Sequence, residues 1–421
     1  MKIFYATVDE YPPFRVDVVQ LFGVFVARSG IEIDWWMRPV APGKRTVVTG
    51  EYGQRYWISW RPRAGGLVGN AARAIAALLH LVGGLFRAIS GDHEIVQVRD
   101  LPLSAIFYLA AARLARRRFV YWMSFPMLEG RQARLADPAV RSRRLKVLAV
   151  RLYVMIAKPV LYRVVLRCAD HVFVQSEEMK KVIAAKGVPS RLMTAIPMGV
   201  NVDLYNTETV AIAALHEAGG RRVLCYVGAI ESIRRPELII ESLALVRRSG
   251  FAVVLLMIGA PDGPEKEKLR RTAELLGLSD DVIWVPFLPL AKALSYVKRA
   301  DICLALCPDT PPLSVASPTK LVEYLAMARP VVANEHPDQR WVIAASGAGL
   351  CVPCTADGFA KGIISLLRDP ARASVAASRG PAWVREHRSY AHLSANVVST
   401  YQQMLKPQTH EGRSLKRRVC E

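Results

Sequence analysis

The chain has 421 residues, of which 52% are hydrophobic and 22% are charged, with a formal net charge of +21. This length and composition suit two globular domains and exclude a disordered or low-complexity protein. The excess of basic residues is concentrated in the first half, which predicts an anionic partner: a membrane surface, nucleic acid or a phosphorylated substrate. The start of the chain, with two acidic residues and two prolines, does not resemble a secretory signal, and seven scattered cysteines favour a reducing cytoplasm.

The first half of the chain alternates strand-like and helix-like segments. A helix is expected at 17–30, and apolar runs rich in β-branched and aromatic residues predict strands at 2–8, 31–37, 94–99, 118–123 and 171–175. This alternation is typical of a parallel sheet. Two apolar stretches, 74–86 and 147–166, are short or interrupted by polar residues, so neither is predicted to span a membrane.

The second half repeats the strand and helix alternation more regularly. Strands are expected at 221–228, 251–259, 280–287, 300–306 and 329–335, with helices between them, which predicts a doubly wound parallel sheet. Ligands of such sheets bind at the carboxyl ends of the strands. Gly228, Gly259 and the loop before Ser317 all fall at such ends, so we expect them to meet at one site.

The segment from Ser317 to Glu323 is the most informative local motif. Ser317 is a suitable N-cap and Pro318 suits the first helical position, so the helix start is expected to present amide donors to a phosphate. Lys320 adds positive charge, and Glu323 offers a carboxylate to sugar hydroxyls. The alternative is an ordinary capped helix in which Lys320 and Glu323 form a surface ion pair.

The order and spacing of the blocks at 171–200, 225–246, 253–289, 294–306 and 317–337 resemble the retaining glycosyltransferases of family 4. The resemblance implies the GT-B fold: two facing Rossmann-like, doubly wound parallel-sheet domains with a cleft between them. The expected domains are 1–205 and 206–380, with helices at 381–405 packing back on the first domain and a basic tail at 406–421. It also implies a UDP- or GDP-sugar donor, no cofactor and no metal.

Matching the family motif residue by residue implies a donor site. Gly228 would let the diphosphate approach the backbone, and Glu323 would bind the nucleotide ribose. The diphosphate would be held by Arg234, which stands where the family usually has lysine, and by Ser317, Pro318, Thr319 and Lys320. Arg234 and Lys320 are therefore the predicted catalytic residues, because they would stabilise the leaving diphosphate.

The sequence departs from the family pattern at two positions. Ala229 replaces a common arginine, for which Arg235 is a candidate substitute, and Val315 replaces the first of two glutamates. The sequence SPTKLVEY instead resembles a branch of the family with an SPxKxxEY motif, which leaves the sugar contacts open. The candidate sugar or acceptor contacts are Ser124, Glu129 and Asp309. The alternative for Ser124 and Asp309 is a plain turn residue.

The first domain contains a basic, apolar segment around 141–167. Arg144, Arg151 and Lys158 recur every seven residues on a helix expected to end at Pro159, so they would form a basic stripe suited to an anionic membrane. The alternative is a core helix with cations on its rim. No nucleic-acid-binding motif accompanies the charge, so no nucleic-acid partner is predicted.

These features together predict a retaining glycosyltransferase that moves a hexose from a nucleotide-sugar to a glycan or lipid-linked acceptor in cell-surface polysaccharide or glycolipid biosynthesis. It would be cytoplasmic and peripheral on the inner face of the cell membrane. One alternative is a GT-B enzyme acting on a small soluble acceptor. The other is a non-catalytic nucleotide-sugar-binding partner of a glycan assembly complex.

Overall fold

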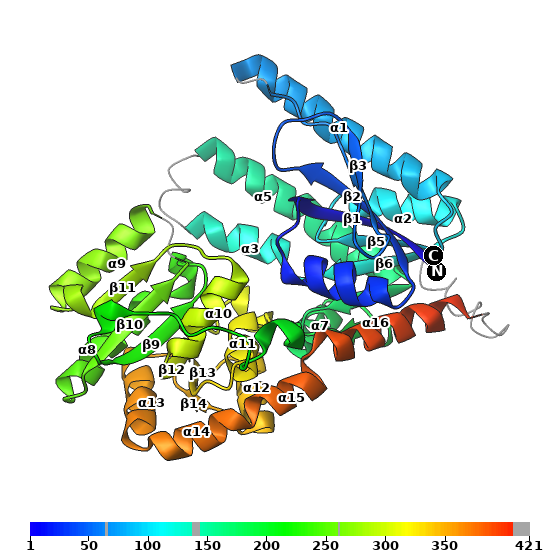
Figure 1. Cartoon of the computed structure of the whole chain (residues 1–421). Coiled ribbons are helices and arrows are strands. Elements are labelled where there is room, and N and C mark those ends of the chain that lie inside the picture. Colours follow the sequence, from blue (N-terminus) through cyan, green and yellow to red (C-terminus); the bar gives the residue numbers. More distant parts are fainter. Residues whose placement is uncertain (64–65, 137–143, 260–261, 407–421) are drawn as a thin grey trace. The chain divides into compact units, whose positions relative to one another are not determined.

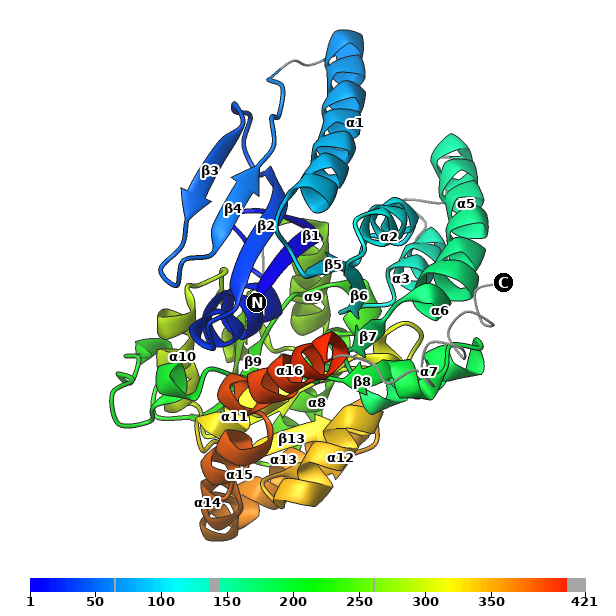
Figure 2. The ribbon, with the colours of Figure 1, turned by 90° about the vertical axis from the view of Figure 1, so that its right-hand side faces the viewer.

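The computed structural model describes residues 1–63, 66–136, 144–259 and 262–406, shown in Figure 1 and turned by 90° in Figure 2. Contacts divide the chain into unit 1, which comprises residues 1–197 and the chain from Leu393 onward, and unit 2, residues 198–392. The sequence predicts domain limits at 205 and 380. Except for Lys406, the predicted basic tail lies outside the described residues.

Unit 1 is built on an eight-stranded sheet in the order β3-β4-β2-β1-β5-β6-β7-β8. Its strands are β1 (Lys2–Tyr11), β2 (Glu32–Pro39), β3 (Thr46–Thr49), β4 (Arg55–Ile58), β5 (Ile95–Arg99), β6 (Arg118–Met123), β7 (His171–Val174) and β8 (Met193–Ala195). Every neighbouring pair is parallel except β3 with β4, which form an antiparallel edge hairpin. The sequence analysis did not anticipate this hairpin, because β3 is short and largely exposed and gives no apolar alternation.

Unit 1 also contains helical segments between and after its strands. The helical segments are Asp17–Val26, α1 (Gly66–Ser90), α2 (Ala105–Leu114), α3 (Met127–Ala133), α5 (Arg144–Pro159), α6 (Leu166–Cys168), α7 (Glu177–Ala185) and most of α16 (Tyr390–Leu405). The α-helix α5 ends at Pro159, where the sequence predicts a break, and the chain continues as a π-type helix, Val160–Val165, and then α6. The apolar stretch 74–86 is the middle of the longer helix α1.

Unit 2 is the doubly wound parallel sheet that the sequence predicted. Its strand order is β11-β10-β9-β12-β13-β14, with all neighbours parallel. The strands are β9 (Arg222–Val227), β10 (Val253–Ile258), β11 (Val282–Val285), β12 (Ile302–Ala305), β13 (Val331–Asn334) and β14 (Leu350–Val352). The helices are α8 (Glu237–Arg248), α9 (Pro264–Leu275), α10 (Leu290–Arg299), α11 (Thr319–Ala326), α12 (Pro337–Ser346), α13 (Ala356–Arg368), α14 (Pro370–Ser378) and α15 (Gly380–His387).

The core of unit 2 lies on both faces of this sheet. Leu224 and Tyr226 of β9 point into a cluster with the side chains of α8 and α13. The alternate residues Val223 and Cys225 point into a second cluster with α10 and α11. Because both faces of the central strand β9 are covered, the position of its carboxyl end is fixed by packing on both sides.

Candidate functional site

Two glycines lie side by side where β9 and β10 end. Gly228 has a φ of 147° and Gly259 a φ of 99°, in the region that side chains disfavour. A Cβ atom on Gly259 would lie 2.8 Å from the carbonyl oxygen of Gly228. The structure thus brings together the ends of β9 and β10, as the sequence predicts. Because glycine has no side chain, no Cβ atom of Gly228 or Gly259 covers the backbone there.

Lys320 reaches the same strand end from α11. Its side chain is buried, and its Nζ donates to the Tyr226 hydroxyl at 3.0 Å and to the Leu306 carbonyl oxygen at 3.1 Å. A Cβ atom on Gly228 would lie 3.4 Å from this ammonium nitrogen. The charge of Lys320 is therefore fixed beside Gly228, at the carboxyl ends of β9 and β12.

The start of α11 differs by one residue from the prediction. Pro318, with ψ of 123°, is the N-cap, and Thr319 is the first helical residue, so Ser317 does not cap the helix. The Ser317 hydroxyl is used elsewhere: it accepts from the amide of Met198 at 3.1 Å and donates to Asp338 at 3.0 Å. The first amides of α11 lack partners within the helix, as at any helix start.

A buried arginine completes the surroundings of Ser317. Arg388 donates to the Ser317 hydroxyl at 2.9 Å and to the Asp338 carboxylate at 2.5 Å, and only 2% of its surface is exposed. An arginine so far from water needs this carboxylate, because an unpaired buried charge is very costly. The hydroxyl of Ser317 therefore stabilises the loop before α11 and is not free for the predicted contact with a phosphate.

Glu323 lies one turn further along α11 and is partly buried. Its Oε1 accepts from the Tyr205 hydroxyl at 3.2 Å. Burial raises the pKa of Glu323, although the Tyr205 hydrogen bond and the charge of Lys320 oppose the shift. The carboxylate thus has one acceptor oxygen bound within the protein and a second oxygen for which no partner is described.

Arg234 and Arg235 lie in the loop between β9 and α8. The side chain of Arg234 is 30% exposed, and its Nε lies 3.4 Å from Glu231. Arg235 adopts a left-handed φ of 52° and is half exposed. Asp309 is exposed in the loop after β12, and both it and Arg235 act electrostatically on Cys354, so these two predicted residues share a neighbourhood.

Three residues that support this edge were missed by the sequence analysis. The Tyr324 hydroxyl accepts the amide of Val227 at 2.8 Å, which holds the last residue of β9 in place. Asn334 accepts from the Cys307 amide at 2.7 Å and donates to its carbonyl oxygen at 2.8 Å, which fixes the loop after β12. Tyr226 lies beneath Lys320. For Tyr226 and Asn334, the available signal was a polar residue at the end of an apolar strand.

In unit 1, Ser124 follows the end of β6 and is buried. Its amide donates to Asp100 at 3.0 Å, and its hydroxyl donates to the same carboxylate. Burial raises the pKa of Asp100 to about 6, even though Arg99 and these hydrogen bonds lower it. The Ser124 hydroxyl is therefore engaged with a protein carboxylate at the carboxyl edge of the unit 1 sheet.

A buried ion cluster adjoins Asp100 and also escaped the sequence analysis. Arg99 donates to Asp17 at 2.8 and 3.1 Å and to Asp9 at 2.5 Å, and Trp122 donates to Asp17 at 2.8 Å. Each group is almost fully buried. These residues are far apart in the sequence, so only the parallel pairing of β1, β5 and β6 brings them together.

Glu129, the other predicted contact in unit 1, belongs to an ion-pair network. It accepts from Lys186 at 2.7 Å and from the Tyr162 hydroxyl at 3.1 Å, and Lys158 lies 3.8 Å away. The carboxylate thus joins α3 to the following helices. Within the described ranges no group of three or more His, Cys, Asp or Glu side chains could hold a metal ion, and metal independence stays a prediction.

The fold is that of the GT-B glycosyltransferases. Sucrose-phosphate synthase from Thermosynechococcus elongatus superimposes with a TM-score of 0.67 at 17% identity, over 96% of this chain and 99% of that chain. HepE of Anabaena, solved in complex with UDP, gives a TM-score of 0.65 at 14% identity, over 96% of this chain and 100% of that chain. Two parallel-sheet α/β units are thus the shared architecture, as the sequence predicted.

Sequence comparison finds a similarity between the second unit and a known family. Residues 209–383 match the family of glycosyl transferases group 1. D-inositol 3-phosphate glycosyltransferase of Nocardia farcinica is 25% identical over 235 residues, 54% of this chain and 51% of that protein. GDP-mannose-dependent alpha-(1-6)-phosphatidylinositol monomannoside mannosyltransferase of Mycolicibacterium smegmatis is 24% identical over 240 residues, 55% of this chain and 61% of that protein.

The chain therefore spans about half the length of the curated relatives it matches. The similarity to glycosyltransferases is therefore concentrated in residues 209–383, and the curated relatives that match the chain are named as glycosyltransferases.

Proposed function

We propose that this protein is a retaining glycosyltransferase that moves a hexose from a nucleotide-sugar to a glycan or lipid-linked acceptor. The observation that carries the proposal is the placement of Lys320, whose buried ammonium group lies beside Gly228 at the carboxyl edge of a doubly wound sheet. A cation and an uncovered backbone at this edge suit the diphosphate of a nucleotide-sugar. Glu323, one turn along α11, suits the hydroxyls of the nucleotide ribose.

The chemistry requires stabilisation of the leaving group. The bond between the anomeric carbon and the phosphate oxygen breaks, and the bond between that carbon and an acceptor oxygen forms. The acceptor proton passes to the leaving phosphate. Negative charge grows on the diphosphate during this step, and Lys320, the amides at the start of α11 and Arg234 supply fixed positive charge there. No metal ion is needed in this scheme.

The proposed acceptor class rests on the names of the relatives and on a groove in unit 1. The Mycolicibacterium relative is named for a lipid acceptor, phosphatidylinositol monomannoside, whereas the other named relatives act on D-inositol 3-phosphate. A groove of about 530 Å³ beside α5 favours the lipid acceptor, since it has apolar and basic walls: Leu135, Val147, Val154 and Met155 with Arg151 and Lys158. A small soluble phosphorylated acceptor is the second candidate, suggested by the inositol phosphate relatives.

We place the enzyme at the cytoplasmic face of an anionic membrane, and α5 supports this. Arg144 and Arg151 are exposed, as are the apolar side chains between and beyond them: Leu145 (84%), Leu148 (64%), Leu152 (51%) and Met155 (65%). Lys158 departs from the predicted stripe, because it turns toward Gln132 at 2.9 Å and toward Glu129. An exposed helix face that mixes arginine with leucine suits an anionic lipid surface.

The donor assignment can be tested by thermal-shift screening of UDP-, GDP- and ADP-sugars, followed by calorimetry with the sugar that stabilises the protein. We expect one nucleotide class to raise the melting temperature, because a ligand that binds only the folded state stabilises that state. Acceptor-dependent release of the nucleotide would then establish transfer. Donor binding with no turnover over lipid-linked, glycan and inositol phosphate acceptors would instead indicate a non-catalytic partner of a glycan assembly complex.

A further inference from the structure

Helix α1 of unit 1 exposes a continuous apolar face. The exposed side chains are Ile75 (55%), Leu78 (61%), Leu79 (56%), Val82 (54%), Phe86 (70%) and Ile89 (38%), and Val68 (76%) extends the row toward the start of the helix. Their spacing of three, four and seven residues places them on one side of the helix. By length and composition, residues 68–90 could also cross a membrane, and they are the one such segment found among the described residues.

The opposite face of α1 is packed against unit 1. Ala76, His80, Gly84 and Ala88 recur every four residues on this side. The carbonyl oxygen of His80 accepts from the Trp36 indole at 2.9 Å, and its Nδ1 lies 3.0 Å from the Ser59 hydroxyl. The polar group that interrupts the apolar sequence therefore points inward, and the outward face is left apolar.

Glycine permits the close approach of α1 to the rest of the unit. A Cβ atom on Gly84 would lie 2.3 Å from the Tyr108 hydroxyl of α2 and 2.8 Å from the Trp36 indole nitrogen. On α2, the neighbour of Tyr108 in the sequence, Phe107, is itself 49% exposed. The apolar face of α1 thus belongs to a helix seated tightly on unit 1, beside a further exposed aromatic side chain.

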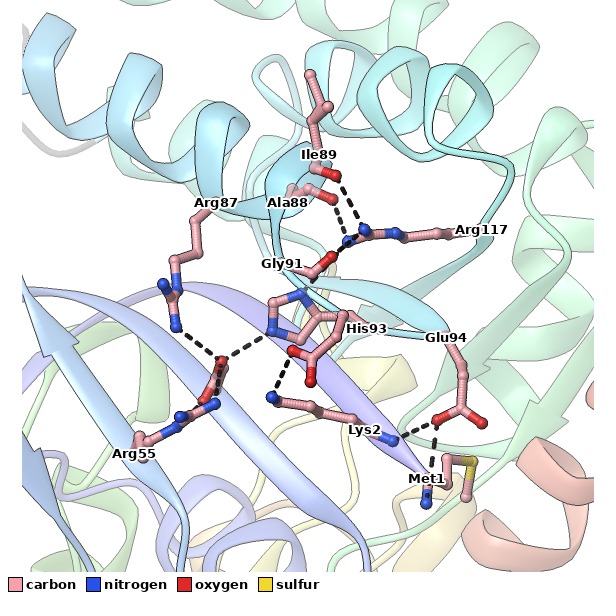
Figure 3. A network of polar contacts seen from close by, with 12 residues as sticks. Met1, Lys2, Arg55, Arg87, Ala88, Ile89, Gly91, His93, Glu94 and Arg117 are labelled. Atoms are coloured by element: carbon pink, nitrogen blue, oxygen red, sulfur yellow. Dashed lines mark hydrogen bonds and ion pairs between the residues drawn. The ribbon is translucent and has the colours of Figure 1, made fainter.

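Polar contacts tie down the carboxyl end of α1, as Figure 3 shows. Arg117 donates to the carbonyl oxygens of Ala88 at 2.6 Å and Ile89 at 2.8 Å, and also to that of Gly91. Arg87 lies 3.5 Å over the Trp57 ring and pairs with Asp34 at 3.3 Å. Such a helix cannot be surrounded by lipid on all sides while these contacts persist.

We infer that α1 lies in the plane of an anionic bilayer, with its outward apolar face among the acyl chains. Residues 66–90 contain the exposed Arg73 and no acidic residue, and Arg144 and Arg151 are exposed on α5, which suits anionic lipid. A long, mostly apolar face with a flanking arginine is the pattern of an interfacial helix. Figures 1 and 2 both show α1 and α5 extending from unit 1 in the same general direction.

This inference rests on the membrane-associated form of the proposed function and assigns its principal anchor. α5 would contribute mainly charge, and α1 would contribute apolar burial. The two contributions differ in their response to salt, because screening weakens electrostatic attraction and leaves hydrophobic burial intact. Binding to vesicles at high salt should therefore depend on α1.

The test is flotation of the full chain with phosphatidylcholine–phosphatidylglycerol vesicles at low and high salt. The variant carries Leu78→Gln, Leu79→Gln, Val82→Gln and Phe86→Gln, and the matched control carries Leu275→Gln and Phe287→Gln, which alter side chains that are 87% and 83% exposed in unit 2. We expect the α1 variant to lose at least tenfold in the ratio of bound to free protein at high salt, while the control floats like the wild type.

Four results would overturn the inference. The α1 variant could float as well as the wild type, or the wild type could fail to float at all. Light scattering could show a dimer that the variant dissociates, in which case a second copy covers the face. Retention of the wild type in membranes after alkaline extraction would show a spanning helix instead. Donor affinity by calorimetry should be the same in the wild type, the α1 variant and the control. A failure of the membrane inference can therefore be distinguished from a failure of the donor assignment.

Discussion

The Nζ atom of Lys320 lies 3.0 Å from the Tyr226 hydroxyl oxygen and 4.1 Å from the centroid of its ring. The two residues come from α11 and β9, and 94 positions separate them in the sequence. Tyr226 offers the ammonium group a hydroxyl and a π face without neutralising its charge. The lysine is therefore held in place beside Gly228, where a diphosphate could approach it.

Replacing Lys320 by methionine should weaken donor binding by about tenfold or more, because a hydrogen bond to a charged group contributes about 1.5–3 kcal/mol. Calorimetry with the donor identified by thermal shift measures the change. Lys298→Met is the matched control, since Lys298 also donates to a backbone carbonyl in unit 2, that of Val210 at 2.6 Å. Equal affinity in the Lys320 variant and the control would remove Lys320 from the donor site.

Donor affinity should fall on acidification, with a midpoint above the ordinary glutamate pKa of 4.5, because burial raises the pKa of Glu323. The ionised carboxylate is the form that accepts from ribose hydroxyls, so protonation removes the contact. Glu323→Gln should bind weakly with little dependence on pH over this range. Tyr205→Phe should move the midpoint to higher pH, since the Tyr205 hydrogen bond lowers this pKa. An unchanged midpoint would count against Glu323 as the titrating group.

Ser317→Ala should reduce stability more than donor affinity. The substitution removes a partner from the buried Arg388 side chain and from the amide of Met198, at a cost of about 1–3 kcal/mol in the free energy of unfolding. Urea unfolding measures this change. Ser295→Ala, which removes an exposed hydroxyl bound to the Lys292 carbonyl oxygen, should have little effect. A large loss of donor affinity in a Ser317→Ala protein of normal stability would restore the hydroxyl as a ligand.

Asp100 should make the protein less stable as the pH rises from about 4 to 6. Its pKa is raised from 3.8 to about 6 in the folded protein, so the folded state holds this proton more tightly than the unfolded state does. The stabilisation is present at low pH and is lost as the carboxyl ionises. At each pH, the unfolding free energy of Asp100→Asn is subtracted from that of the wild type. The difference isolates the pH dependence of stability that Asp100 contributes. A difference that stays flat across this pH range would contradict the prediction.

The sequence by itself determined the class of fold and the position of the candidate site along the chain. Strands such as Val253–Ile258, buried on both faces, are continuous apolar runs, and glycines such as Gly228 mark where strands end, so local pattern is sufficient for both. The segment from Ser317 to Glu323 is informative for the same reason: its residue types and spacing are local.

Only the tertiary structure decided what each side chain contacts. Ser317 has the composition of an N-cap, yet its hydroxyl binds Met198, Asp338 and Arg388, partners that are 119, 21 and 71 positions away. The apolar sequence around His80 gives no indication that the histidine points inward and the leucines outward. Such contacts depend on which strands and helices pack together, and the free energy of that packing is shared among residues far apart in the chain.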